Sequence, residues 1–518
     1  MEGIPDPDVV VSPDDPDDPN DPMVSTDYVV KKREKPMFNR SGKRKPVQVK
    51  DFKSGNDNEL ESSSSKHEKH QPNDTKIEIE QLEKILGASL NDIHEPLGDQ
   101  CCIYKVPKDL RNIDTKAYTP QVISIGPFHF ANPALTGMEK QKIRYALEFC
   151  RREGAAEKLK EFETFIHDNE KHIRNCYQEI SSLLKIEFVK VIIRDAVFII
   201  EFFLRSAEPV EKRGFDLFLD TPCVRAPITR DLQLLENQLP YFVLKKLFEL
   251  GAFHNFSKED YPDSDPFLIL SHRFFFNPKD GGFPEPKNKN EYKIQHFTDL
   301  RRHFLLMDFL PQDQKQGEHV GDLPTATELH WSGVKFTKGI EGRCEYGPRA
   351  VRIPYFKSYG ELRIPFTKEL TLQIPRFVID DYSECLYRNL MALELWRYKD
   401  DTHICNFILL MDRLINTEKD VDLLVDQKII FSRLGDNATV ATMFNNLGLQ
   451  ITPSKSVYHS LGKMLKEHYD SHGWVRFLNR NMATLITVYF GDLWTATKTF
   501  AAVILLVLTF IQAVYSIR

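Results

Sequence analysis

The sequence predicts a mainly α-helical protein with a small β insert, an α+β chain that starts with a disordered extension and ends in a transmembrane helix. Apolar residues recur at helical spacing through most of residues 76–480, which predicts a single large helical domain. Between residues 323 and 379, short β-prone runs broken by glycine and proline replace that pattern. Residues 500–517 contain no charged side chain, which is typical of a membrane-spanning helix.

Residues 1–75 have the composition of a disordered extension. Residues 1–22 contain eight acidic residues, six prolines and no basic residue, so they cannot bury enough apolar surface to offset the entropy of ordering. Residues 23–53 reverse the sign, with ten lysines and arginines against three acids. The basic segment at residues 31–53 is either a nuclear-import or anionic-lipid signal, or a solvated tail that neutralises its acidic neighbour.

The composition argues against several classes of function. A net charge of -6 and a pI near 6.3 do not attract nucleic acid, so we expect no nucleic-acid partner. The eight cysteines show no C-x-x-C spacing, which argues against a zinc site and favours a reducing compartment. The N-terminus lacks the basic and apolar regions of a secretory signal, which predicts synthesis in the cytosol.

The first half of the folded part is expected to be helical after an irregular start. Residues 101–130 are short apolar pieces broken by proline and glycine, which predicts extended loops and turns. The run VKVIIRDAVFIIEFFL at residues 189–204 contains four charged side chains, which favours a buried core helix over a membrane span. Residues 230–250, RDLQLLENQLPYFVLKKLFEL, carry an apolar stripe typical of a helix that Pro240 kinks or restarts.

The second half is expected to place a small sheet or a set of hairpins between helical segments. The β-prone runs lie at about residues 323–379. Helices return after residue 380 and continue to about residue 480, where a juxtamembrane segment at 481–499 begins. Because the insert is short for a core of its own, one helical unit over residues 76–480 is the simplest interpretation.

The motifs of common enzyme classes are missing from the sequence. We find no phosphate loop, no dinucleotide-binding glycine pattern, no nucleophile elbow and no protein-kinase signature. We therefore assign no catalytic, cofactor-binding or metal-ligating residue. The sequence leads us to expect no cofactor, no small-molecule substrate and no enzymatic activity.

One pair of histidines has a spacing that occurs in metal sites. His468 and His472 lie at i and i+4, so they would share one face of a helix, with Glu467 or Asp470 as a third ligand. The H-E-x-x-H order of zinc proteases is missing. Solvated side chains on a polar helix are therefore the favoured interpretation.

A second pair of histidines flanks an aspartate. His296 and His303 lie on either side of Asp299 in the run HFTDLRRHF. Histidine and aspartate are common acid–base groups, but no further catalytic signature accompanies them. We interpret the three as polar groups on the surface of a helix or at its cap.

Two acidic sites complete the set of polar candidates. Asp380 and Asp381 are adjacent, so they point in different directions, and their position before a helix favours capping over acid–base pairing. Glu236 and Asn237 are flanked by leucines, which predicts partial burial. Buried polar groups need partners, so a structural hydrogen-bond network is favoured over an active site.

A series of long motifs runs collinearly through residues 101–518. They are IYKVPKDLRNIDTKAYTPQVISIGPFHF, MEKQKIRYALEF, RDLQLLENQLPYFVLKKLF, HFTDLRR, TATELHWSGVKF, LTLQIPRFVIDDYSECLYRNLMALE, MDRLI, DVDLLVDQKII, FNNLG and the apolar tail. In this order the sequence resembles the large plant family that carries the domain of unknown function 247. Where the family usually has aspartate-glycine-cysteine-phenylalanine, this sequence has Asp195-Ala196-Val197-Phe198. The LENQ segment of the family is intact at residues 235–238.

The resemblance implies a plant protein with a helical domain, a C-terminal transmembrane segment and no demonstrated enzymatic chemistry. In grasses, members of that family resemble or act as self-incompatibility determinants in pollen, and other members are linked to defence or development. The N-terminal extension lies outside the resemblance, so nothing is implied for residues 1–100.

The charge-free C-terminal run is just long enough to span a bilayer. Eighteen helical residues at about 1.5 Å each give about 27 Å, against a hydrocarbon core of about 30 Å. Trp494 and Lys498 precede the run, and Tyr515 and Arg518 end it, where interfacial aromatic and cationic side chains belong. The alternative is a helix docked on a soluble core, for which a broader polar face is expected.

Two sets of residues in this run have different expected roles. The predicted membrane anchor residues are Phe500, Leu505, Leu508, Phe510 and Val514. A narrow polar stripe is a candidate contact with another helix inside the membrane, and it consists of Thr509, Gln512 and Ser516. Basic residues before the run outnumber the single Arg518 after it, so the positive-inside rule predicts a cytoplasmic location for the large domain.

Three functions compete on the sequence alone. The leading hypothesis is a recognition or signalling protein, anchored in the plasma membrane or an endomembrane, that binds an unknown protein partner through its helical domain and the lipid bilayer through its C-terminal helix. One alternative is an enzyme with an unrecognised site, in which the acidic and histidine candidates would converge in a cleft. The other is a nuclear protein that uses the basic segment 31–53.

Overall fold

The computed structural model describes ten segments of the chain, all within the compact unit Ile93–Arg518. They are residues 98–152, 154–179, 182–251, 265–276, 293–306, 317–318, 321–339, 370–453, 455–489 and 493–516. The predicted disorder of residues 1–75 and the basic segment at 31–53 lie outside the described residues. Residues 340–369 of the predicted β insert do so as well.

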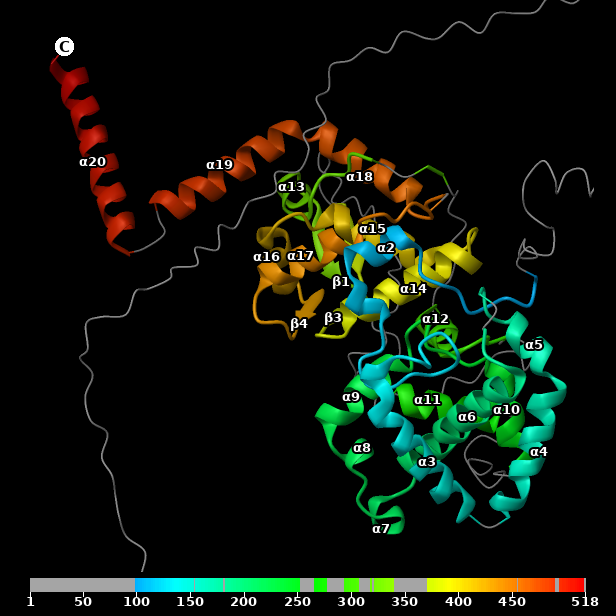
Figure 1. Cartoon of the computed structure of the whole chain (residues 1–518). Helices are drawn as coiled ribbons and strands as arrows, with labels where there is room; N and C mark the ends of the chain where they lie inside the picture. Colours follow the sequence, from blue (N-terminus) through cyan, green and yellow to red (C-terminus); the bar gives the residue numbers. More distant parts are fainter. Residues whose placement is uncertain are drawn as a thin grey trace, which may run out of the picture. The chain divides into compact units, whose positions relative to one another are not determined.

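Helix α6 is the centre of the first hydrophobic cluster. It runs from Lys185 to Ala207 and packs against α3 (Thr136–Cys150), α4 (Ala155–Asp168), α10 (Tyr241–Leu250) and α11 (Pro266–Phe275) (Figure 1). Most of its side chains between Phe188 and Leu204 are buried. A helix that is apolar on nearly all sides needs neighbours all round, and these four helices supply them. The prediction of a core helix is therefore confirmed.

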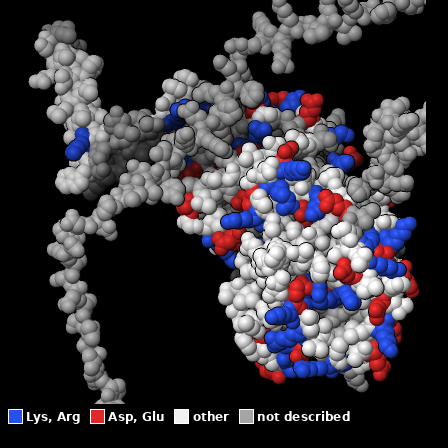
Figure 2. Space-filling view, viewed as in Figure 1, with Lys and Arg blue, Asp and Glu red and all other residues white. Residues whose placement is uncertain are grey.

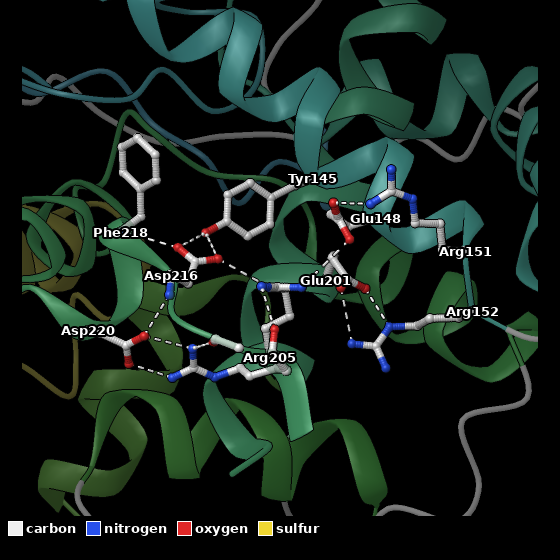
Figure 3. Close-up of polar contacts among 11 residues, drawn as sticks. Tyr145, Glu148, Arg151, Arg152, Glu201, Arg205, Asp216, Phe218 and Asp220 are labelled. Atoms are coloured by element: carbon white, nitrogen blue, oxygen red, sulfur yellow. Dashed lines mark hydrogen bonds and ion pairs between the residues drawn. The ribbon is translucent and has the colours of Figure 1, made fainter. Parts of the chain in front are cut away.

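Two carboxylates of this apolar region, Glu201 and Asp216, are buried together with hydrogen-bonding partners. Glu201 accepts hydrogen bonds from Arg152 at 2.6 Å and 3.1 Å, and burial raises the pKa of Glu201 although the guanidinium opposes that shift. Asp216 accepts from the Tyr145 hydroxyl at 2.8 Å and from Arg205 at 3.2 Å (Figure 3). Opposite charges at hydrogen-bond distance make burial tolerable, so these residues fit inside a helical core.

Several short helices complete this part of the fold. They are α2 (Lys108–Ile113), η2 (Thr115–Tyr118), η3 (Pro133–Leu135), α5 (Glu170–Asn175), α7 (Val210–Arg213), α8 (Leu217–Asp220), α9 (Pro222–Asp231) and α12 (Phe297–Leu306). The loops predicted for residues 101–130 thus contain two helices, α2 and η2. The sequence pattern missed them because six residues show less than two helical turns of periodicity.

A second hydrophobic cluster is built from the later helices. They are α13 (Ala326–Trp331), α14 (Ser383–Arg397), α15 (His403–Leu414), α16 (Glu418–Asp426), α17 (Asn437–Leu447) and α18 (His459–Ser471). Their apolar faces meet around α14, and Phe377 packs there against Phe407 and Phe444. Buried side chains of α2 and η2 join the same cluster, so residues near the start of the folded part pack with the C-terminal helices.

Four short strands lie beside these helices. Strand β1 (Lys335–Lys338) pairs with β2 (Thr371–Ile374), and β3 (Phe377–Ile379) pairs with β4 (Ile430–Ser432). Both pairs are parallel, so the hairpins proposed for residues 323–379 are wrong for the described strands. Parallel strands need long crossover connections, and helices α14, α15 and α16 form the connection between β3 and β4. The insert is therefore tied into the helical core and also contains α13.

The helix predicted across residues 230–250 is divided in two. Helix α9 ends at Asp231 and α10 begins at Tyr241 directly after Pro240, so the restart at Pro240 is confirmed and the continuous apolar stripe is wrong. Residues 232–240 form turns instead. Leu232 and Leu239 are buried in the first cluster, whereas Leu235 is buried in the second. This irregular segment, called the LENQ loop below, therefore contacts both clusters.

Two helices end the described chain. Helix α19 runs from Gly473 to Tyr489 and contacts α13, and α20 runs from Leu493 to Ser516 (Figure 1). Helix α20 starts seven residues before the predicted span at residue 500, and residues 517 and 518 lie outside the described part. The mainly helical fold with short strands and a C-terminal apolar helix is therefore as predicted.

Candidate functional site

Helix α20 presents an apolar surface that the rest of the described chain does not cover. Residues Thr497–Ser516 form a helix long and apolar enough to cross a membrane, and none of its most apolar window is buried. A helix docked on a soluble core would bury one face. Apolar side chains left in water are costly at about 25 cal/mol per Å², so this surface needs another environment.

The predicted anchor residues all lie on this exposed surface. Their exposed fractions are 64% for Phe500, 63% for Leu505, 55% for Leu508, 68% for Phe510 and 49% for Val514. In the polar stripe, the Thr509 hydroxyl donates to the Leu505 carbonyl within the same helix at 2.7 Å. That bond satisfies the hydroxyl without a second helix. Gln512 and Ser516 are exposed in the same helix, and their contact with another helix stays a prediction.

Glu236 of the LENQ loop is the most heavily paired of the polar candidates. Its carboxylate accepts the Val106 N–H at 2.7 Å and a charged hydrogen bond from Arg111. Lys105 and His129 approach it at 3.9 Å and 3.5 Å. Burial alone would raise the pKa of Glu236, but these groups outweigh burial and hold that pKa below its usual value. The side chain is 2% exposed, so Glu236 fastens α2 to the LENQ loop as a carboxylate.

The two amides that follow Glu236 satisfy backbone groups of distant segments. Asn237 accepts the Ile125 N–H at 2.7 Å and donates to the Ile123 carbonyl at 2.9 Å. Gln238 accepts the Phe297 N–H at 2.9 Å. Both side chains are fully buried, where an unpaired amide would be expensive. The predicted structural hydrogen-bond network at Glu236 and Asn237 is therefore present.

His296 and Asp299 are buried, so their predicted place on a helix surface is wrong. His296 contacts the Cys102 carbonyl through Nε2 at 3.1 Å, and its Nδ1 accepts the Asp299 N–H at 3.4 Å. Asp299 accepts the Gln295 N–H at 2.9 Å and the Tyr398 hydroxyl at 2.6 Å. These contacts cap the first turn of α12, so the predicted capping role is confirmed.

The two histidines around Asp299 carry opposite pKa shifts. Burial lowers the pKa of His296 to about 4, because the charged imidazolium would lose its hydration, although Asp299 and the Cys102 carbonyl oppose this shift. Burial also opposes charge on His303, but Asp299 outweighs it and raises the pKa of His303. Asp299 lies 3.5 Å from His303 Nδ1, and the pKa of Asp299 is lowered despite its burial.

Replacing His296 with glutamine is expected to remove part of the acid sensitivity of the fold. Between pH 6.5 and about 4, His296 is protonated in the unfolded chain but neutral in the folded chain. The unfolded state therefore gains stability relative to the folded state as the pH falls, and the wild-type free energy of unfolding decreases through this window. The slope is about 1.4 kcal/mol per pH unit. Urea unfolding of both proteins at several pH values would measure it. A difference in unfolding free energy that is constant from pH 7 to 4 would contradict the assignment.

The remaining candidates have local roles. Asp380 accepts the Tyr382 N–H at 3.1 Å and the Ser383 hydroxyl at 2.8 Å in the turn before α14. The N-cap residue of α14 is Tyr382, without a side-chain capping bond, so the predicted capping by Asp380 is wrong, and Asp381 is exposed. His468 and His472 stack with ring centroids 4.0 Å apart. Within the described residues no group of three histidine, cysteine or acidic side chains is arranged to hold a metal ion.

The structure thus joins some candidates and separates others. His296 and Asp299 are hydrogen-bonded neighbours, whereas Glu236 is bonded to Val106 and Arg111, and Asp380 is bonded within its own turn. Each of these groups is occupied by internal hydrogen bonds. The arrangement is suited to holding loops in place, and its carboxylates and imidazoles are turned toward protein groups.

Sequence reasoning missed a buried ion pair in the first cluster. The Lys142 ammonium, fully buried, lies 2.7 Å from Asp195 and donates to the Ser124 carbonyl at 2.5 Å. Asp195 also accepts the Gly126 N–H at 2.9 Å. A Cβ at Gly126, where φ is +72°, would lie 2.5 Å from the Gln238 carbonyl oxygen, so only glycine fits. The signal was Asp195 in an otherwise apolar stretch of α6, because a buried carboxylate needs a counter-ion.

The comparisons with known proteins agree with the motifs of the chain. A family profile described as plant protein of unknown function, DUF247, matches residues 103–508, which include the LENQ loop and most of α20. The chain belongs to the DUF247 family. Two relatives from Arabidopsis thaliana are similar to this DUF247 protein over most of their length. The UPF0481 protein At3g47200 is 27% identical over 81% of this chain and 87% of its own.

The second relative of the DUF247 chain is the putative UPF0481 protein At3g02645, which is 24% identical over 86% of this chain and 96% of its own. No solved structure matches the chain. The family is one of unknown function, so its name supplies no activity. What the DUF247 chain does has to be argued from its exposed helix and its surface.

Proposed function

We propose that this DUF247 protein is anchored in a membrane by α20 and acts by binding another protein through its helical domain. The observation that carries the proposal is the uncovered apolar surface of Thr497–Ser516. Twenty helical residues span about 30 Å, which equals the hydrocarbon thickness of a typical bilayer. Trp494 is 76% exposed at the start of this stretch and Tyr515 is 74% exposed at its end, where interfacial aromatic side chains belong.

Binding without catalysis is the second part of the proposal. Its support is that Glu236, His296 and Asp299 use their polar atoms in hydrogen bonds that hold α2, the LENQ loop and α12. On the face drawn in Figure 2, lysines and arginines are interspersed with acidic side chains. A mixed surface of this kind suits a protein partner and gives no broad positive field for nucleic acid. Recognition in self-incompatibility or defence is the finer form of this proposal.

The membrane topology follows from basic residues near α20. Arg476 and Arg480 precede the span, Lys498 lies in its first turn, and Arg518 follows it. The positive-inside rule favours the more basic flank in the cytoplasm, so we place the helical domain on the cytoplasmic side of the plasma membrane or of an endomembrane. A protein partner of this domain is then cytoplasmic.

Placing an arginine in the middle of the span tests the anchor. Leu508→Arg is expected to raise the free energy of insertion by about 3 kcal/mol and to move the protein from the carbonate-washed membrane pellet to the supernatant. The matched control is Leu449→Arg, because Leu449 is 49% exposed on the helical domain. The control should stay in the pellet. Wild-type protein that is released by carbonate would refute the anchor.

Protease protection tests the sidedness separately. In sealed vesicles from expressing cells, an N-terminal tag on the cytoplasmic side is digested without detergent. A tag that survives until detergent is added would place the helical domain in the lumen or outside the cell, which would reverse the proposed topology and leave the anchor intact.

A further inference from the structure

Helix α19 has its apolar and polar faces arranged in the opposite way to a helix on a soluble domain. Trp474 is 72% exposed, Phe477 58% and Leu478 45%. At about 100° per residue these positions share one face. The rings of Trp474 and Phe477 stack with centroids 5.7 Å apart. The three side chains therefore form one apolar patch that stays about half exposed or more among the described residues.

Polar residues on the other side of α19 make its contacts with the protein, although Asn479 and Arg480 are also exposed to solvent. The Arg476 guanidinium lies 3.8 Å from the centre of the Tyr469 ring and donates to the Tyr469 carbonyl at 3.1 Å. The Asn479 amide donates to the Trp331 carbonyl at 2.9 Å, and Arg480 lies over the Trp331 ring. Water would select the reverse arrangement, with the apolar face on the core. The contacts of α19 with α13 and α18 thus orient Trp474 and Phe477 away from the helical domain.

The position of α19 in the chain identifies what covers the patch. Helix α19 is about 26 Å long, and three residues, 490–492, separate its end from the start of α20, so α19 lies near the membrane surface if α20 spans the bilayer. The sequence of α19 contains arginine and no acidic residue. Tryptophan and phenylalanine beside arginine are the side chains that settle at a lipid headgroup boundary.

We propose that α19 lies in the headgroup region of the bilayer that α20 crosses, with Trp474, Phe477 and Leu478 immersed in lipid. The proposal rests on the anchor proposed above and adds a second contact between the protein and the membrane. Because Arg476, Asn479 and Arg480 tie α19 to α13 and α18, an immersed α19 holds the helical domain close to the membrane surface. The domain then presents a fixed face toward the cytoplasm.

Spin labels on the full-length protein in phosphatidylcholine–phosphatidylserine vesicles test this arrangement. One cysteine per protein replaces Phe477 in α19, Asp470 in α18 or Val507 in α20, in a background where Cys150, Cys223, Cys344 and Cys385 are serine. The native cysteines that stay, Cys101, Cys102, Cys176 and Cys405, are buried. Asp470 is exposed on the helix that precedes α19, so its label reports water. A label at Leu478→Cys repeats the measurement if the Phe477 variant does not fold.

The expected result is that the label at residue 477 collides more with oxygen than with a water-soluble nickel complex, as the label at 507 does, while the label at 470 shows the reverse. A label at 477 that behaves like 470 overturns the interfacial helix, and the label at 507 then reports separately whether the anchor stands. Low accessibility of residue 477 to both reagents overturns it too, because a second protein surface would be covering the patch.

Discussion

Replacing Lys142 with methionine is expected to destabilise the fold by about 3–5 kcal/mol, because it leaves Asp195 buried without its counter-ion. Lys142 is fully buried, and its ammonium contacts Asp195 and Glu139, each at 2.7 Å. Burial already raises the pKa of Asp195 against the effect of Lys142. Urea unfolding of the full-length protein in detergent, followed by tryptophan fluorescence, would measure the loss.

The matched control is Lys140→Met, two residues away on the exposed side of α3. A surface change of this kind should stay within about 0.5 kcal/mol. The double variant Lys142→Met with Asp195→Leu should recover part of the loss, because no charge is then left unpaired. Recovery is incomplete since the Gly126 N–H loses its acceptor. Equal effects of the Lys142 and Lys140 variants would contradict the buried pair.

Replacing Phe203 with alanine is expected to cost about 3–5 kcal/mol by opening a cavity in the aromatic part of the first cluster. Phe203 is fully buried and stacks on Phe274 with ring centroids 4.1 Å apart. Phe275 and Phe297 pack around it at 5.7 Å and 5.4 Å. These rings come from three different helices, so the cavity cannot close by the shift of one side chain.

Phe215→Ala is the matched control for this cavity, since the Phe215 side chain is 70% exposed. It removes the same atoms and should change the unfolding free energy by less than about 0.5 kcal/mol. Phe203→Leu, which leaves a smaller void, should fall between the two. If the alanine variants at 203 and 215 lost the same stability, the aromatic packing around α6 would be wrong.

The helices with strong periodicity could be predicted from the sequence. In α6, apolar residues on all sides and a few charges identified a core helix, and two of the charges, Asp195 and Glu201, proved to be buried in ion pairs with Lys142 and Arg152. The helix α20 could also be predicted, because a long uninterrupted run of apolar residues is by itself typical of a membrane-spanning helix. The start of a helix shortly after Asp380 and Asp381 also followed from local sequence alone.

Contacts between distant segments could not be predicted from spacing. His296 and Asp299 were assigned to a helix surface because they are polar, but Cys102 and Tyr398, about 190 and 100 residues away, supply their partners. The leucines of the LENQ loop have helical spacing, yet the loop forms turns. In these turns the side chains of Asn237 and Gln238 accept the backbone N–H groups of Ile125 and Phe297. Periodicity records which side chains are apolar, and it does not record where a distant donor will lie.

The parallel strand pairs illustrate the same limit. Strand β4 is three residues long, too short to show alternation, and its partner β3 lies some fifty residues earlier in the chain. A sequence of short β-prone runs therefore suggested hairpins, which need only local pairing. The pairing that forms depends on the packing of α14, α15 and α16 between the strands.

The LENQ loop has a consequence for how the domain opens. The Leu235 N–H donates to Asn389 in the second cluster, while Gln238 accepts the Phe297 N–H in the first. Local separation of either cluster breaks hydrogen bonds that position the other, so their opening free energies are linked. Residues 232–240 thus connect the two clusters by hydrogen bonds, and we expect the clusters to unfold as one cooperative unit. A change that destabilises one cluster is therefore expected to destabilise the other as well.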